Sequence, residues 1–278
     1  MNNFISALLN PDITFIRYAV IAGIISSIPF GIIGSFVVVK RMSYIAGAVS
    51  HCVLGGIGMA LFLSTVFNLT FITPMIGAVI FAVFAGLIIS YAQIKMDERT
   101  DTVIGAIWAI GMSLGLLFMS VTPGYLDPMS YLFGNILLIT KDDLLIITGM
   151  NLIIVAFSIV FYNQLLITAF DEEFAKIRGL NTNAFNTLLI LLISFTVLLM
   201  ITIVGIVMVI ALLTLPAAIA GLFTVKFKNM ILLSIILCMI FTSVGLLGSY
   251  ILNLPTSSVT VVFAGITYLG SLILSKFV

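Results

Sequence analysis

Charged residues are scarce in this chain. Lys, Arg, Asp and Glu together make up 8% of its 278 residues, whereas a soluble domain carries roughly 25%. Hydrophobic residues reach 62%, and the mean hydropathy is +1.36. A water-soluble globule of this size would lack the polar groups needed to cover its surface. The composition therefore excludes an ordinary soluble enzyme or binding domain and indicates that lipid surrounds most of the chain.

Residues that usually carry chemistry are also few. There is one histidine, His51, and there are two cysteines, Cys52 and Cys238, each inside an apolar run and without a CxxC neighbour. We predict that both thiols are buried and behave as small hydrophobic groups. The chain has no phosphate-binding G-x-x-x-x-G-K-[ST] or G-x-G-x-x-G motif. We therefore expect no catalytic site, no stably bound cofactor and no nucleic-acid partner.

Long hydrophobic runs fill the chain instead. A transmembrane helix needs about 20 mostly apolar residues. Nine runs qualify, with eight or ten spans as alternatives, and the division between the sixth and seventh is the least marked. They are Ile13–Val39, Tyr44–Val66, Leu69–Ile94, Thr102–Val121, Leu144–Phe170, Ala184–Ile203, Val204–Val225, Met230–Leu252 and Ser257–Leu274. Residues 1–12 show no cleavable signal, so the spans themselves should direct insertion.

The few charges test this span count. If nine spans alternate, nine of the 11 basic residues fall on one side of the membrane, and only Arg17 and Lys141 fall toward the other. Cytoplasmic loops carry the excess of Lys and Arg. The sequence therefore predicts an all-α, multi-pass membrane protein, a bundle of about nine transmembrane helices, with its C-terminus in the cytoplasm.

One outer connection is itself apolar. Residues 131–139 follow the turn signals Pro123-Gly124 and Asp127-Pro128 and precede Lys141. This segment is too short to cross a bilayer, so we predict a re-entrant or interfacial helix.

His51 is the one ionisable residue well inside a predicted span. Such residues are costly in a membrane and face a bundle interior or a wet cavity. Gly47 and Gly55 lie one turn before and after it, with Ser43, Ser50 and Gly58 nearby. These small residues permit either close helix approach or free space beside the imidazole. His51 is thus either a histidine that joins two helices or a transient metal ligand on a permeation path.

A short amphipathic helix is predicted for residues 171–180, on the cytoplasmic side. Asp171 can cap it, acids fill its first turn and bases its last, and Gly179 can end it. Phe174, Ile177 and Ala175 are expected to form a small apolar face. This segment is either a plain connector or a docking helix for a cytoplasmic partner.

Five blocks, in order, resemble the permeases of metal-ion importers of the ATP-binding cassette (ABC) type, which take up zinc, manganese or iron. The similarity covers nearly the whole chain. The blocks are 35–51, with Lys40-Arg41-Met42-Ser43 and Ser50-His51; 132–135; 170–179; 204–218; and Asn253-Leu254-Pro255.

The resemblance implies that residues 1–278 form one transmembrane permease domain of the bacterial plasma membrane. It also implies a dimer of identical or related permeases with the pathway between them. It also implies that cytoplasmic ATPase subunits dock on a coupling helix at about 171–180, and that an extracytoplasmic protein delivers the metal. His51 would be the metal ligand. The docking residues would be Asp171, Glu172, Glu173, Phe174, Ala175, Lys176 and Gly179.

The chain departs from this family at one informative position. Many members carry Gly-Asp where this chain has Ala46-Gly47, four residues before His51. That carboxylate would share a helix face with the imidazole, so its absence leaves the ligand set and the metal open.

Two other classes of function compete with the importer. A secondary transporter or channel could use His51 as an ion or proton relay, although few other buried charges accompany it. An intramembrane enzyme would need a carboxylate or a second ligand at the same depth, and the sequence places none there.

Overall fold

In a computed structural model, residues 14–96, 99–124, 127–134 and 139–276 are described. Within these ranges nine helices are long and apolar enough to cross a membrane, as the sequence predicts. They are α2 (Thr14–Val39), α3 (Ser43–Val66), α4 (Pro74–Lys95), α5 (Thr100–Val121), α7 (Lys141–Val160), α10 (Thr182–Val204), α11 (Ile206–Phe223), α12 (Phe227–Leu252) and α13 (Thr256–Leu274). Ile13 lies outside the described residues.

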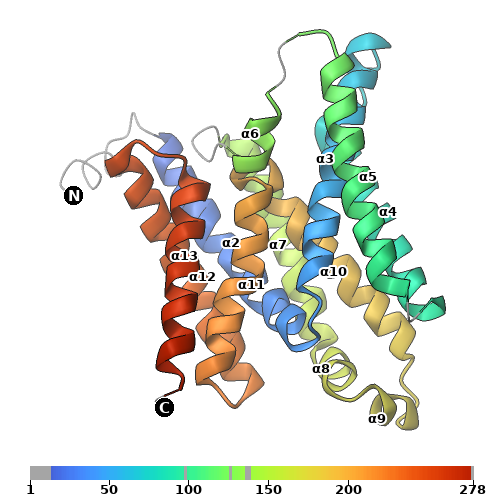
Figure 1. The fold of residues 1–278 in the computed structure, drawn as a ribbon, viewed down its shortest axis with the longest axis vertical. Helices are drawn as coiled ribbons and strands as arrows, with labels where there is room; N and C mark the ends of the chain where they lie inside the picture. Colours follow the sequence, from blue (N-terminus) through green and yellow to red (C-terminus); the bar gives the residue numbers. More distant parts are fainter. Residues whose placement is uncertain (1–13, 97–98, 125–126, 135–138, 277–278) are drawn as a thin grey trace.

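The spanning helices form one bundle (Figure 1). Helices α3, α4 and α5 stand together at one side, α12 and α13 stand at the other, and α2, α7, α10 and α11 lie between them. In the most apolar window of α3, 83% of the residues are buried, against 22% in α5, α7 and α13. The helix that carries His51 is therefore the most enclosed span, whereas α5, α7 and α13 present most of their apolar side chains outward, as lipid requires.

The two ends of the bundle differ in charge. The C-terminus, the short helices α8 (Tyr162–Phe170) and α9 (Glu172–Ile177), and the α2–α3, α4–α5 and α11–α12 connections lie at the lower end in Figure 1. These segments and the residues directly next to them hold the nine basic residues that the sequence places on one side. By the positive-inside rule we take the lower end as cytoplasmic.

The weakly marked division between the sixth and seventh runs is real. Helix α10 ends at Val204, α11 begins at Ile206, and Gly205 between them has a φ of 85°, which favours glycine. A β-carbon at Gly205 would overlap the backbone of Phe133 and Gly134. Only glycine therefore lets the outer segment reach the break between the two spans.

Three predicted boundaries were wrong. The fifth run is not one helix, because α7 ends at Val160 and α8 starts at Tyr162 after a break at Phe161. Helix α4 begins at Pro74 rather than near Leu69, since Thr73 caps it by accepting a hydrogen bond from the Ile76 amide. The short outer helix is α6 (Pro128–Phe133), which starts earlier than predicted because Asp127 caps it and Pro128 suits its first turn.

Helix α6 stops at Gly134, whose φ is 66°. Residues 135–138, which make up much of the predicted segment, lie outside the described residues. The end of α6 contacts the break at Gly205, and α6 also packs against α10, α11 and α13, although none of its residues is buried.

Candidate permeation and docking sites

His51 lies about one third of the way along α3, eight residues and so about 12 Å from the start of this 24-residue helix. It is 9% exposed. Its ring stacks on Trp108 of α5, with ring centroids 5.0 Å apart and an angle of 22° between the planes. The imidazole is therefore held against an aromatic face contributed by the neighbouring helix.

The imidazole lacks the polar partner that a histidine joining two helices should have. The Nδ1 atom of His51 is buried, and within the described residues no atom hydrogen-bonds to it. An unsatisfied buried polar atom costs about 1–3 kcal/mol. Because of this cost, the structure favours a ligand-binding role for His51 over a role in helix packing. The same described residues contain no cluster of three His, Cys, Asp or Glu side chains that could hold a metal permanently.

The small residues of α3 allow close helix packing rather than leaving free space beside the imidazole. A β-carbon on Gly55 would lie 2.9 Å from the Gly111 carbonyl oxygen, and one on Gly58 would lie 2.6 Å from that of Gly115. Glycines on both helices thus bring the backbones of α3 and α5 into contact.

Trp108 occupies the space beside Gly47. A β-carbon on Gly47 would overlap the six-membered part of the indole ring. The same ring stacks on His51, so the place where many family members have a carboxylate is filled here by an aromatic side chain. The proposed free space beside the imidazole is therefore absent on this side.

Both cysteines are buried and free, as predicted. Cys52 is 7% exposed and Cys238 is fully buried. The thiol of Cys238 donates to the Leu212 carbonyl oxygen at 3.4 Å.

The predicted amphipathic helix is α9. Asp171 caps it, because its Oδ1 accepts a hydrogen bond of 2.8 Å from the Phe174 amide. At the other end Gly179 has a φ of 78°, and the Leu180 amide donates to the Ala175 carbonyl at 3.0 Å. This is the glycine-terminated helix end that the sequence predicts.

An ion pair anchors α9 to the membrane bundle. The Lys40 Nζ atom, just after α2, donates to Glu172 Oε1 at 2.8 Å and to Asn186 Oδ1 of α10 at 2.6 Å. The Asn186 amide also donates to Glu172 Oε1, at 2.9 Å. Burial raises the pKa of the Glu172 carboxyl, but the hydrogen bonds from Lys40 and Asn186, with the Lys40 and Lys176 charges, outweigh it and hold that pKa below its ordinary value.

The apolar face of α9 differs from the expected one. Phe174 and Ile177 are 42% and 84% exposed, whereas Ala175 is fully buried. The Arg178 guanidinium lies 4.8 Å from the centre of the Phe174 ring. Ala175 therefore packs against the protein, and two large apolar side chains remain in solvent, where they can enter a partner's pocket.

A cavity of about 300 Å³ links this corner to the start of α3. Lys40, Glu172 and Asn186 line one part of it, and Tyr44 of α3 and Asp101 of α5 line another. The α9 anchor therefore lies across this cavity from the first turns of α3, which carries His51, and of α5.

Sequence reasoning missed Trp108, Lys40 and Asn186 as parts of these sites. Trp108 is the single tryptophan in the chain, and Gly111 and Gly115 follow it at helical spacing. This pattern could have predicted that one face of the helix packs closely against another helix. Nothing in the sequence indicates which face of α3 it meets. The ion pair joins residues 132 positions apart.

Comparison with known proteins gives a consistent result. The model of the ABC 3 transport family matches residues 12–275. A probable metal transport system membrane protein of Chlamydia trachomatis is 35% identical over 90% of this chain and 86% of its own length. The manganese import system permease protein ScaB of Streptococcus gordonii is 31% identical over 94% and 91%.

Solved structures share the architecture. PsaBC from Streptococcus pneumoniae, in complex with Fab, is 32% identical with a TM-score of 0.84 over 97% of this chain and 94% of its own. A putative metal-chelate type ABC transporter in an inward-facing conformation has a TM-score of 0.75 at 15% identity over 92% and 84%, which shows the fold alone.

These relatives are permeases, so the intramembrane enzyme is excluded and the ATP-hydrolysing site belongs to a separate subunit. The nine apolar helices and the family match together indicate a multi-pass bacterial membrane protein rather than a free-standing secondary transporter. The chain belongs to the ABC 3 transport family and is the membrane-spanning permease of an ABC importer.

Proposed function

We propose that this permease carries a divalent transition-metal ion into the cell, with zinc, manganese and iron as candidates. The relatives named as metal or manganese transport proteins support this substrate class. The observation that carries the proposal is the buried Nδ1 of His51, which lies well inside a span and has no hydrogen-bond partner among the described residues. A neutral imidazole is a good ligand for these ions.

His51 would bind the ion in transit rather than store it. Two permease copies would supply two imidazoles, fewer than the four ligands of a closed structural zinc site. Transport requires a site weak enough to release its ion. The absence of a carboxylate at Gly47, with Trp108 in its place, removes the hard oxygen ligand that manganese prefers. Position 47 therefore leaves the ligand set open, and manganese is the metal named for several relatives.

Helix α9 would couple the permease to its ATPase. Phe174 and Ile177 are exposed at the end of the bundle that we take as cytoplasmic, and an exposed apolar pair on a short helix suits a groove on a partner. Lys40, Glu172 and Asn186 would transmit the partner's movement to α2 and α10. A metal-binding protein would deliver the ion from the opposite side.

Radiometal uptake by the assembled transporter tests the role of His51. His51→Ala, His51→Asn and His51→Gln are expressed with the partner subunits, and uptake of zinc, manganese and iron is divided by the amount of complex. We expect His51→Ala to lower uptake at least about tenfold, because the ligand nitrogen is lost. His51→Asn and His51→Gln should rescue poorly, since amides are weaker ligands for these ions.

The alternative role predicts another pattern. If His51 only joins helices, His51→Gln would transport at the normal rate with unchanged metal preference, and His51→Ala would mainly lower the yield of complex. That result would remove the metal-binding role of His51.

A further inference from the structure

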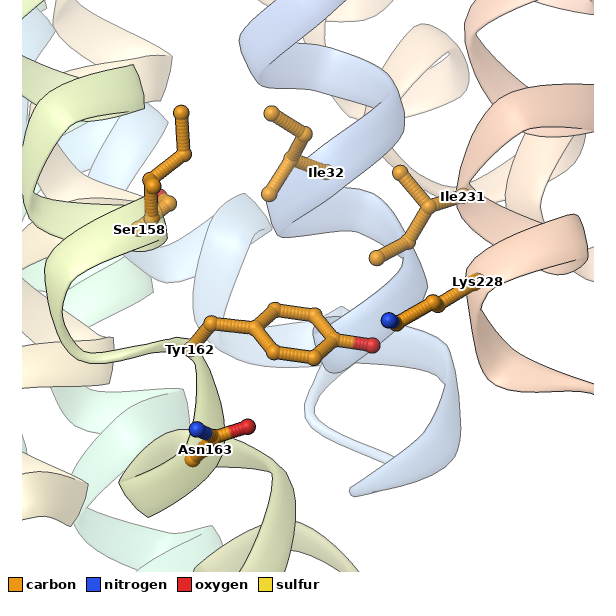
Figure 2. Close-up of a pocket in the computed structure, with 7 residues that line it drawn as sticks. Ile32, Ser158, Tyr162, Asn163, Lys228 and Ile231 are labelled. Atoms are coloured by element: carbon orange, nitrogen blue, oxygen red, sulfur yellow. The ribbon is translucent and has the colours of Figure 1, made fainter.

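A second cavity, of about 400 Å³, opens between α2, the junction of α7 with α8, and α12 (Figure 2). It lies at the level where spanning helices end, because Tyr162 is the first residue of α8 and Lys228 is the second residue of α12. Both segments belong to the basic end of the bundle. The cavity is thus at the membrane interface, away from the α3–α5 pair.

The floor of the cavity is polar and cationic. Figure 2 shows the Tyr162 hydroxyl pointing toward the Lys228 ammonium, with Asn163 just below. The Lys228 Nζ atom lies 5.9 Å from the centre of the Tyr162 ring. In the part of the chain that the structure describes, no carboxylate pairs with Lys228 and no hydrogen bond engages the Tyr162 hydroxyl. A cation and a donor therefore converge on space that the described residues leave open.

The polar groups are held in place. The Tyr162 ring packs edge-on against Phe36 at 6.4 Å and also contacts Phe227 at 6.4 Å. Lys228 follows Phe227 directly at the start of α12. The position of the Tyr162 hydroxyl is consequently set by packed aromatic rings, so this side chain loses little freedom when a ligand binds.

The opposite wall is apolar and continues into the bilayer. Ile32, Ile159 and Ile231 line it, and Ile159 is 67% exposed. In Figure 2, Ile32 and Ile231 lie above the Tyr162–Lys228 pair. Ile32 lies seven residues before the end of α2, about 10 Å deeper in the membrane. The cavity thus changes from cationic to apolar along the direction of a lipid chain.

We propose that this cavity binds an anionic phospholipid, with the phosphate on Lys228 and Tyr162 and an acyl chain along Ile32 and Ile231. The charge is complementary, since basic pockets between helices at the cytoplasmic side hold anionic headgroups. A free anion would leave the apolar wall in contact with water or lipid, and it would gain nothing from that wall. The bound lipid would join α12 to α8, which leads directly into α9.

Native mass spectrometry of the detergent-purified, assembled transporter tests this proposal. Phosphatidylglycerol and phosphatidylcholine with identical acyl chains are titrated against the wild type and Lys228→Ala. The matched control is Lys95→Ala, which removes an equally exposed lysine at the same end of the bundle. Inorganic phosphate is added as a competitor. Lys228→Arg and Tyr162→Phe serve if Lys228→Ala does not assemble.

We expect phosphatidylglycerol to bind the wild type more tightly than phosphatidylcholine. Lys228→Ala should weaken the phosphatidylglycerol complex about fivefold, which corresponds to one lysine at a membrane surface, while Lys95→Ala leaves it unchanged. Lys228→Arg should retain binding, and Tyr162→Phe should lose a smaller part of it. Equal weakening by Lys228→Ala and Lys95→Ala, or equal affinity for the two lipids, would overturn the proposal.

Two further outcomes would assign the cavity to another occupant. Displacement of the bound species by millimolar inorganic phosphate would identify a free-anion site. Dissociation of permease dimers in Lys228→Ala, without a change in lipid adducts, would identify an interface between two copies. Either result would contradict lipid binding and leave the metal-import function untouched.

Discussion

The pairing of α3 with α5 and the corner formed by α8 and α9 are built in opposite ways. Around His51, glycines bring the two backbones so close that a single added carbon on Gly111 would lie 2.5 Å from the Cys52 Cα. At the other site, one ion pair and a few hydrogen bonds hold α9, and Phe174 and Ile177 remain exposed.

The α3–α5 pair is therefore rigid, whereas the contact that holds α9 can adjust. Close backbone packing has no alternative arrangement nearby, because interiors are dense and resist small changes. A partly exposed ion pair contributes little and can be exchanged for contacts with a partner. An ion site beside His51, as proposed, would therefore have a defined shape, whereas a docking site on α9 would be free to adjust.

The largest effect on the stability of the bundle itself is expected at the α3–α5 contact. Gly111→Ala places a methyl group against the Cys52 backbone and should lower stability by about 1–3 kcal/mol. Gly105→Ala on the same helix meets nothing within 4 Å and should be neutral or slightly stabilising, because alanine favours helix. Thermal unfolding in detergent measures both. Equal melting temperatures would show that the two helices are not tightly packed.

A charge on α9 should break the docking contact while the bundle stays folded. Phe174→Asp would bury an unpaired charge in the partner, at a cost of several kcal/mol, so ATPase co-purification should fall at least about tenfold. The control is Leu254→Asp, which changes a residue of similar exposure in the α12–α13 connection at the opposite end. Normal ATPase assembly in Phe174→Asp would contradict the docking role.

The role of Trp108 beside His51 can be tested by placing at position 47 the carboxylate that many family members carry. Gly47→Asp alone should lower the yield of folded protein, because its β-carbon overlaps Trp108. Gly47→Asp combined with Trp108→Ala should recover folding and add an oxygen ligand, which shifts uptake toward manganese. The measurement is the ratio of manganese to zinc uptake per complex. An unchanged ratio in the double variant would mean that position 47 does not face the ion.

The smallest effect is expected at the ion pair. Because the pKa of Glu172 is lowered in the folded protein, its charge stabilises the fold above the ordinary carboxyl pKa, and this contribution disappears as the pH falls through the lowered value. Glu172→Gln should therefore melt below the wild type near neutral pH, by at most about 1 kcal/mol, with the difference closing below pH ~4.5. Glu173→Gln, an exposed neighbour, is the control. A difference independent of pH would contradict the role of the charge.

The spans and the ends of α9 could be predicted because they depend on neighbouring residues. A run of apolar residues must form a helix in lipid, since its backbone has no other hydrogen-bond partners. Asp171 and Gly179 mark the ends of α9 through their own local hydrogen bonds and dihedral angles. Gly205 likewise separates two spans that hydropathy runs together.

Only the tertiary structure determined which residues of these helices contact one another. Composition could not show that Trp108 would cover Gly47, that Lys40 would hold Glu172, or that α7 would end one residue before Phe161. These features depend on the rotation of each helix and on residues distant in sequence. Hydropathy specifies that a segment spans the membrane, but in lipid it gives little preference for one apolar face over another, so close packing and paired polar groups select the faces that meet.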